Sequence, residues 1–158
     1  MNHTNNKILI VDDDKQCLVE LSNILEPQFY GEVLVCEDND HSREVICDHL
    51  TAVGIKAAIV HNGKEGLDLV LERMNTGEEP FDLILMDIQM PVMDGLEAAS
   101  KMVLSGVETP IVAFTANIIS NDLEIYRTSG FSYIIRKPFV AQDLWQCLYK
   151  YLRLVEDG

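Results

Sequence analysis

The stretch FDLILMDIQMPVMDG, residues 81–95, holds the features that decide the fold. It opens with a short apolar run, FDLILM (81–86), with little polar interruption. Continuous runs of this kind are typical of strands in a parallel sheet that is covered on both faces. Asp87 follows the run directly, and the turn-forming residues Pro91 and Gly95 come soon after it. The stretch therefore predicts a buried strand with an aspartate just beyond its carboxyl end.

Four more apolar runs of similar length flank this one and alternate with segments of helical periodicity. Strands that alternate with helices predict an α/β protein, because each crossover helix has to traverse one face of the sheet. We expect a three-layer α/β/α sandwich with a five-stranded parallel sheet and five helices. The other four runs are EVLVC (32–36), IKAAIV (55–60), PIVAF (110–114) and SYIIR (132–136).

Two helical stripes are strong and three are weaker. Apolar residues recur at i, i+3, i+4 and i+7, which is typical of an amphipathic helix. The strong stripes are Leu67, Val70, Leu71 and Met74, and Leu144, Cys147, Leu148 and Tyr151. The weaker ones are Ile46, Leu50 and Val53, then Leu96, Ala99 and Val103, and a segment around Ile119 and Leu123.

Polar residues follow four of the five predicted strands. In an open parallel sheet, ligands bind beyond the carboxyl ends of the strands, so these side chains are expected to form one site. Carboxylates placed close together repel each other unless a cation compensates them, and an all-oxygen set favours Mg²⁺ over zinc. The residues are Glu37 and Asp38, Asp87, Thr115 and Lys137.

The residue types at this site suit the transfer of a phosphoryl group. Asp87 would be the nucleophile, since carboxylates form aspartyl-phosphates. The metal held by Glu37 and Asp38, the hydroxyl of Thr115 and the ammonium of Lys137 would each neutralise part of the incoming negative charge.

Four segments resemble the response-regulator receiver family of two-component signalling. Within this family, the sequence is most similar to the receivers of hybrid sensor histidine kinases. The resemblance covers residues 32 to about 154 and implies a flavodoxin-like sheet with strand order 2-1-3-4-5. The D-x-x-M-P-x-M-D-G pattern, with the other three segments in order, is highly specific. The segments are EDN (37–39), LILMDIQMPVMDG (83–95), PIVAFTA (110–116) and KPF (137–139).

The resemblance also implies a set of roles. Asp38, Asp87 and the backbone carbonyl of Gln89 would coordinate Mg²⁺, with Glu37 acting mainly through bound water. The phosphoryl group would come from a phosphohistidine on a histidine kinase or a histidine phosphotransfer protein. Gln89 and Asn117, two residues after Asp87 and Thr115, would modulate hydrolysis of the aspartyl-phosphate.

One position departs from the family pattern. Receivers usually carry Tyr or Phe three residues before the lysine, as a switch coupled to the threonine, but this chain has Ile134 there. Tyr133 is its neighbour and should point to the opposite face, because side chains alternate along a strand. We expect the surface of the fourth helix, fifth strand and fifth helix to carry the response by contact with a downstream protein. It is also a candidate homodimer surface.

The N-terminal residues contain a partial repeat, because KILIVDDDK (7–15) resembles EVLVCEDND (32–40). We expect three parts: residues 1–31 as a receiver-like fragment with a strand at 7–11 and a helix at 15–26, residues 32–154 as the receiver, and residues 155–158 as a tail. The strand at 7–11 would add to the sheet, pair with another molecule to give a homodimer, or stay without order. An alternative parse starts the domain at Lys7 and makes FYGEVLVC its second strand. The run IKAAIV would then be one strand more than a fold of five strands can use.

The acidic composition makes some classes of binding partner improbable. Acidic residues outnumber basic ones by 26 to 12, and the formal net charge of −14 disfavours nucleic acid and anionic membranes. No apolar run approaches the roughly 20 residues of a membrane span, and the start lacks a signal-peptide layout, so we expect a cytoplasmic protein. The four cysteines lack ligand spacing and are expected to be buried thiols: Cys17, Cys36, Cys47 and Cys147.

Two other functions stay open from the sequence. VDDDK (11–15) is similar to the nucleophile strand of haloacid-dehalogenase-like phosphatases, but the hydroxyl residue expected shortly after the second aspartate is missing. The fold could also serve only as a binding or dimerisation module. Since the chain stops soon after the fifth helix, no separate catalytic domain is expected, and self-catalysed phosphotransfer and hydrolysis would be the only reactions. Whether the chain is a stand-alone regulator or part of a hybrid kinase stays open.

Overall fold

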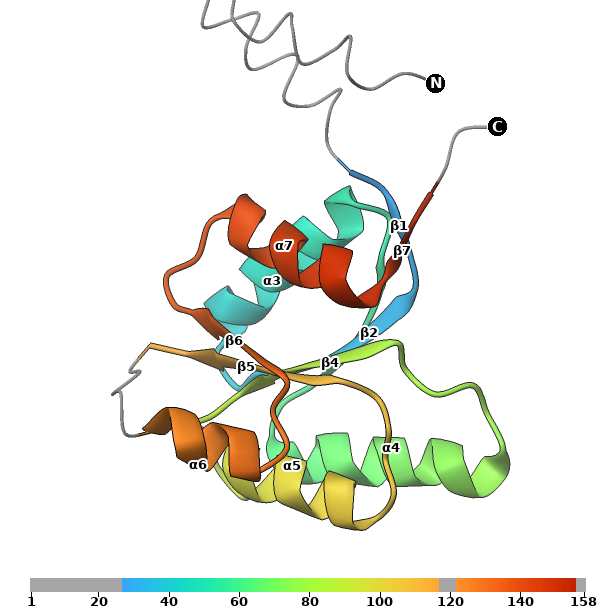
Figure 1. Cartoon of the computed structure of the whole chain (residues 1–158), viewed down its shortest axis with the longest axis vertical. Helices are drawn as coiled ribbons and strands as arrows, with labels where there is room; N and C mark the ends of the chain where they lie inside the picture. The colour runs from blue at the N-terminus through green and yellow to red at the C-terminus, as the bar shows by residue number, and fades with distance from the viewer. Residues whose placement is uncertain (1–26, 117–121, 156–158) are drawn as a thin grey trace, which may run out of the picture.

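The computed structural model describes residues 27–116 and 122–155. Its main sheet has five parallel strands in the order β3-β2-β4-β5-β6, which is the predicted order 2-1-3-4-5 counted from the first of them (Figure 1). β2 lies between β3 and β4, so the run EVLVC takes the place of the first strand in this five-stranded sheet, not of the second strand as the parse that begins at Lys7 requires. The strands are β2 Glu32–Cys36, β3 Lys56–Val60, β4 Leu83–Asp87, β5 Ile111–Thr115 and β6 Tyr133–Arg136.

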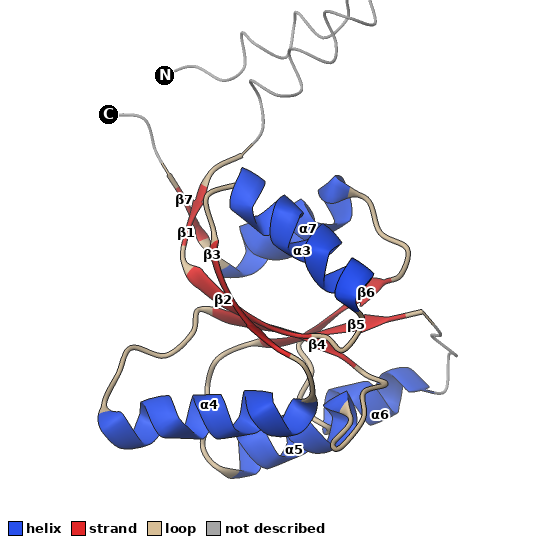
Figure 2. Cartoon of the chain, turned by 180° about the vertical axis from the view of Figure 1, so that it is seen from behind, coloured by secondary structure: helices blue, strands red, loops and turns tan. Residues whose placement is uncertain are grey.

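Helices cover both faces of this sheet, as a three-layer sandwich requires (Figure 2). On one face lie α3 Asp40–Ala52 and α7 Ala141–Tyr151. The other face carries α4 Gly63–Thr76, α5 Gly95–Leu104 and α6 Asp122–Thr128. Side-chain oxygens of Asn39, Asn62 and Asp94 cap the starts of α3, α4 and α5 by accepting backbone N–H groups, which explains where these helices begin. None of the helices in the described ranges is long and apolar enough to span a membrane.

The core consists of two apolar clusters, one on each face of the sheet. Neighbouring residues of the central strands point to opposite clusters: Leu83 and Leu85 face α3 and α7, whereas Ile84 and Met86 face α4 and α5. Because both faces are covered, every side chain of the run from 83 to 86 is buried. This explains why the strands are continuous apolar runs in the sequence and do not alternate.

The two strong helical stripes lie in α4 and α7 and are confirmed except for Met74, which is 46% exposed, and two of the weaker stripes are wrong in detail. In α5, Ala98, Ala99 and Met102 are buried while Val103 is exposed. The small side chains lie at a close contact between helices, since a Cβ on Gly63 of α4 would lie 2.9 Å from that of Ala98. In α6, Leu123 is exposed and Tyr126 is buried instead. Ile119 lies outside the described residues.

A second, two-stranded sheet joins the start and the end of the domain. β1 Phe29–Tyr30 pairs antiparallel with β7 Arg153–Leu154, and the Val155 N–H donates to the Gln28 carbonyl at 2.7 Å. The Phe29 ring is buried and packs edge-on against Tyr149 at 5.2 Å between centroids. The folded domain thus includes Phe29 and Tyr30, whereas its start is predicted at residue 32. The strand expected at 7–11 and the helix expected at 15–26 lie outside the described residues.

We expect Phe29→Ala to lower the free energy of unfolding by about 3 kcal/mol, because it leaves a cavity in the core beneath α3 and α7. Phe29 is only 1% exposed, whereas Tyr30, the next residue, is 56% exposed. Tyr30→Ala is therefore the matched control and should change stability by less than about 0.5 kcal/mol. Urea unfolding followed by circular dichroism measures both. Equal effects of the two substitutions would show that β1 is not part of the core.

Candidate phosphoacceptor site

The carboxyl ends of four strands converge on one acidic site. Glu37 and Asp38 follow β2, and Asp87 is the last residue of β4. One ligand oxygen from each of these three carboxylates lies within 4.8 Å of the others. Thr115 ends β5, one residue beyond Phe114, which is the register partner of Asp87. The structure thus brings the predicted residues together, and it shows Asp87 and Thr115 as the last residues of their strands, not the first residues after them.

Lys137 joins the site from the end of β6. Its Nζ lies 2.8 Å from Oε2 of Glu37 and 3.5 Å from Oδ2 of Asp87. Glu37 is only 1% exposed, and its Oε1 accepts the backbone N–H of Asn39 at 3.2 Å. A buried carboxylate needs such partners because burial removes its hydration. Glu37 is therefore an anchor for Lys137 as well as a member of the acidic cluster.

The electrostatics of the site disfavour a charged Asp87. Burial raises the pKa of Asp87 to about 6, and the charge of Glu37 acts in the same direction, while the ammonium of Lys137 lowers it. Lys137 compensates only part of the negative charge, because three carboxylates share the site with it. A further cation would relieve the repulsion that remains.

This pKa predicts a measurable effect on the metal-free protein. In buffer with EDTA at pH 8, Asp87→Asn should raise the free energy of unfolding by roughly 1–3 kcal/mol. The folded-state pKa lies above the usual value of 3.8, so the ionised carboxylate costs stability at high pH, and the wild type recovers it as the pH falls through about 6. Urea unfolding of both proteins at pH 8 and pH 4 tests this, and the difference should shrink at pH 4. A variant less stable than the wild type at pH 8 would contradict the expectation.

The residues at the site fit a hard divalent cation. Three carboxylates lie close together, and no histidine or cysteine of the described residues joins this cluster. Asp38 is exposed and open to a hydrated ion, while Glu37 is buried and tied to Lys137. Oxygen ligands with room for water are what Mg²⁺ prefers. The side chain of Gln89 is exposed, and its backbone carbonyl accepts no backbone hydrogen bond among the described residues.

Two further residues support the site, and neither is predicted to do so from the sequence, where Gly95 is expected only as a turn residue. Arg43, one turn into α3, donates from Nη1 to the backbone carbonyl of Glu37 at 2.9 Å and pairs with Asp40. Gly95 begins α5 against the end of β4, where an added Cβ would lie 2.2 Å from the carbonyl oxygen of Asp87. The Asp-Gly pair at 94–95 is a sequence signal for the second of these, but nothing in the sequence marks Arg43.

Ile134, which stands where receivers usually carry the aromatic switch residue, faces the opposite side of the sheet from Tyr133, as the alternation of side chains along β6 predicts. Ile134 packs against the cluster beneath α4 and α5, and Tyr133 packs against the opposite cluster. The ring of Tyr133 lies 6.4 Å from that of Tyr151 in α7. Tyr133 therefore cannot take the place of the usual aromatic residue. Asn117 lies outside the described residues.

Comparison with known proteins agrees with this geometry. Residues 33–149 match the family model of the response regulator receiver domain, and the chain belongs to this family. It is 34% identical over 134 residues to the transcription factor SKN7 of Candida albicans, covering 85% of this chain but 22% of that protein. It is 35% identical over 119 residues to the two-component response regulator ORR41 of Oryza sativa subsp. japonica, covering 75% of this chain and 92% of that protein.

A solved structure with the same fold comes from a histidine kinase. It is the receiver domain of CKI1 from Arabidopsis thaliana, complexed with Mg²⁺ and BeF₃⁻, with a TM-score of 0.62 and 32% identity. The match covers 73% of this chain and 88% of that domain. The chain is thus similar to receivers that stand alone and to receivers that are parts of longer proteins.

Proposed function

We propose that Asp87 accepts a phosphoryl group from a phosphohistidine in a Mg²⁺-dependent reaction. The observation that carries this proposal is the cluster of Glu37, Asp38 and Asp87 within 4.8 Å, with Lys137 beside it at the ends of the strands. A carboxylate, a cation-binding pair and an ammonium are the groups that phosphoryl transfer to a carboxylate needs. The haloacid-dehalogenase reading has no support within the described residues, since VDDDK (11–15) lies outside them.

In this reaction an oxygen of Asp87 attacks phosphorus and the bond to the donor imidazole nitrogen breaks. The nitrogen keeps the electron pair of that bond, so the donor histidine is left neutral after proton exchange with solvent. When bound, the metal ion would neutralise charge on the phosphoryl oxygens and on Asp87. Glu37, Asp38, Asp87 and the Gln89 carbonyl would hold it, the last three directly and Glu37 mainly through water.

Lys137 and Thr115 have separate roles in the proposal. Lys137 now lies between Glu37 and Asp87, and it would pair with the phosphoryl group while Glu37 keeps it in place. Thr115 is buried at the end of β5 and would donate its hydroxyl hydrogen to a phosphoryl oxygen. Gln89 and Asn117 would modulate hydrolysis by shaping the access of water to Asp87.

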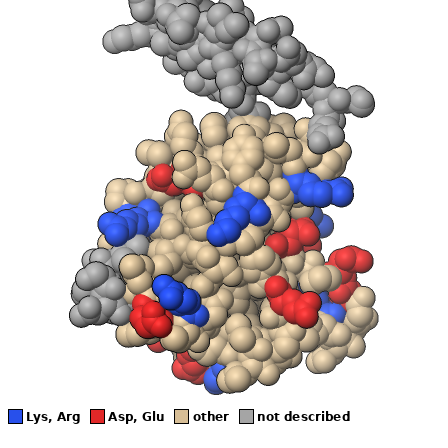
Figure 3. All heavy atoms as spheres, viewed as in Figure 1, with Lys and Arg blue, Asp and Glu red and all other residues tan. Residues whose placement is uncertain are grey.

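The partners that follow from the proposal are proteins. The donor would be a histidine kinase or a histidine phosphotransfer protein in the cytoplasm, and the output would pass by contact through the surface of α6, β6 and α7. On the face drawn in Figure 3, basic and acidic side chains are interspersed among uncharged ones, which gives no broad basic surface there for nucleic acid. A homodimer through this surface, or through a strand at 7–11, is part of the proposal.

The test uses the purified chain, Mg²⁺ and either acetyl phosphate or beryllofluoride. Mass spectrometry should show one added phosphoryl group. The fluorescence of Trp145, on α7, should change with beryllofluoride. EDTA should abolish both signals. If neither reagent acts, a phosphorylated phosphotransfer protein is added as donor, and failure of that donor too would favour a module that only binds.

A further inference from the structure

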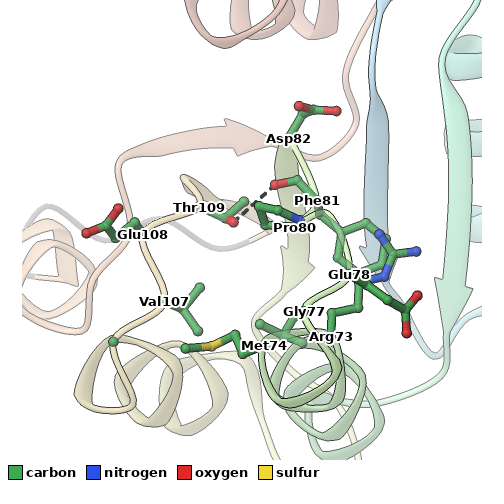
Figure 4. Close-up of a pocket in the computed structure, with 12 residues that line it drawn as sticks. Arg73, Met74, Gly77, Glu78, Pro80, Phe81, Asp82, Val107, Glu108 and Thr109 are labelled. Carbon is green, nitrogen blue, oxygen red and sulfur yellow. Dashed lines mark hydrogen bonds between the residues drawn. The ribbon is translucent and has the colours of Figure 1, made fainter.

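A groove of about 570 Å³ lies at the opposite end of the sheet from Asp87 (Figure 4). Its walls are the end of α4, the segment before β4 and the segment between α5 and β5. Since Asp87 and Thr115 end the strands that begin at this groove, the length of a strand separates the two sites. The groove volume is in the range of about 300–1,000 Å³ that is usual for binding sites.

The floor of the groove is apolar. Phe81 and Val70 are buried beneath it, and Met74 and Val107 line it nearer the surface. Met74 is 46% exposed, although the sequence predicts it as the last member of the buried α4 stripe. A methionine adapts its shape to what it contacts, so it is a suitable floor for an inserted aliphatic side chain. The Thr109 hydroxyl donates to the Phe81 carbonyl at 3.1 Å and fixes the inner wall.

The one arginine at the groove has its charge compensated from within the domain. Nη1 and Nη2 of Arg73 lie 2.8 and 3.2 Å from the two carboxylate oxygens of Glu32, and Nη1 also donates to the Glu79 carbonyl at 3.1 Å. Its guanidinium carbon lies 3.7 Å from the centroid of the Phe81 ring. Arg73 therefore serves as a wall of the groove and is not available to an anionic ligand.

The rim that remains is negatively charged. Met74 and Val107 lie between two acidic side chains, with Glu78 on one side and Glu108 on the other, as Figure 4 shows. Asp82 lies above them in this view. Glu78 and Glu108 are exposed. Glu78 accepts the Thr76 hydroxyl at 3.0 Å and its charge also acts on Arg73, while Asp82 accepts the Glu32 N–H at 2.8 Å. An apolar floor between two exposed carboxylates is complementary to an aliphatic side chain flanked by cations.

Two glycines keep the walls of the groove low. Gly77 and Gly106 have φ of 75° and 92°, and a Cβ added to either would meet no atom within 4 Å. The groove is thus open beside α4 and beside α5, so a chain segment can lie across it.

We propose that this groove binds a basic amphipathic segment of a partner protein. An aliphatic or methionine side chain of the segment contacts Met74, Val107 and Phe81, and lysine or arginine residues beside it pair with Glu78 and Glu108. The net charge of the chain, −14, also favours a basic partner over an acidic one. The inference is independent of phosphoryl transfer, because no residue of the groove belongs to the site at Asp87.

The experiment titrates the ¹⁵N-labelled full chain with an amphipathic peptide made only of leucine and lysine. A second peptide has serine in place of every leucine, and hexylamine serves as a small amine. We expect the leucine–lysine peptide to shift the amide signals of Met74, Gly77 and Val107, and the serine–lysine peptide to bind at least about tenfold more weakly. Met74→Glu and the double variant Glu78→Gln/Glu108→Gln should each weaken binding by about tenfold.

Matched controls separate the groove from general attraction to an acidic protein. Leu104→Glu changes a side chain that is 87% exposed and lies outside the groove, and Glu44→Gln/Asp48→Asn removes two exposed charges from α3. Both controls should bind like the wild type. Equal weakening by groove and control variants, or shifts centred elsewhere, would overturn the proposal. Hexylamine that shifts the same amides as strongly as the peptide would make the groove a small-amine site and would also overturn it.

Discussion

We expect Asp87→Asn to abolish phosphoryl uptake, with a loss of more than about a thousandfold in the rate of labelling by acetyl phosphate. The amide of asparagine is not a nucleophile towards phosphorus, and it removes one of the three carboxylates that lie within 4.8 Å. Binding of beryllofluoride should be lost for the same reason, since it would mimic the phosphoryl group on the carboxylate. The two measurements are the mass of the intact chain and the fluorescence of Trp145.

The matched control for this substitution is Asp48→Asn. Asp48 is an exposed carboxylate on α3, and it is not a member of the acidic cluster. The Asp48→Asn variant should take up the phosphoryl group on Asp87 at the wild-type rate. If Asp87→Asn were still labelled, the modified residue should be located by peptide mapping, and an adduct on any other residue would remove Asp87 from its proposed role.

Gly95→Ala should destabilise the folded domain by about 3 kcal/mol and also reduce phosphoryl uptake. The added Cβ would lie 2.2 Å from the carbonyl oxygen of Asp87 and 3.0 Å from Cα of Ile88, so the backbone at the end of β4 has to move. The Gly95 N–H also donates to the Ile88 carbonyl at 2.8 Å, and this bond would be strained by the shift. Urea unfolding measures the first effect and labelling by acetyl phosphate the second.

Gly77→Ala is the comparison for this prediction. Gly77 is in the left-handed conformation at the end of α4, and an alanine there meets no other atom, so only the backbone cost of about 1–2 kcal/mol remains. Labelling of Asp87 should be unaffected. If Gly95→Ala were no more harmful than Gly77→Ala, the contact between α5 and Asp87 would be looser than the structure indicates.

The central strands and the site residues could be predicted because their sequence signals are local. The strand from Leu83 to Met86 is buried on both faces, so it reads as an unbroken apolar run, and Asp87 follows from it directly. Thr115 and Lys137 lie at strand ends whose convergence follows from parallel topology alone.

Other features depend on contacts between distant segments and leave little trace in the sequence. β1 and β7 have two residues each, which is too short for any periodicity, and their pairing joins opposite ends of the domain. The exposure of Val103 and Leu123 depends on how closely α5 and α6 approach their neighbours. The bond between Lys137 and Glu37 links residues a hundred positions apart, so the sequence could place both at the site but could not pair them.

The pairing of β1 with β7 also determines how the domain responds to a pulling force. The Val155 N–H donates a hydrogen bond to the Gln28 carbonyl, so these two residues lie at the same end of the antiparallel pair. Tension applied at Gln28 and Val155 would therefore pull the two strands apart from that end, one hydrogen bond after another. Such unzipping resists force less than shearing, in which all the bonds of a ladder stretch together. The ribbon would then open before the main sheet and withdraw Phe29 from beside α7.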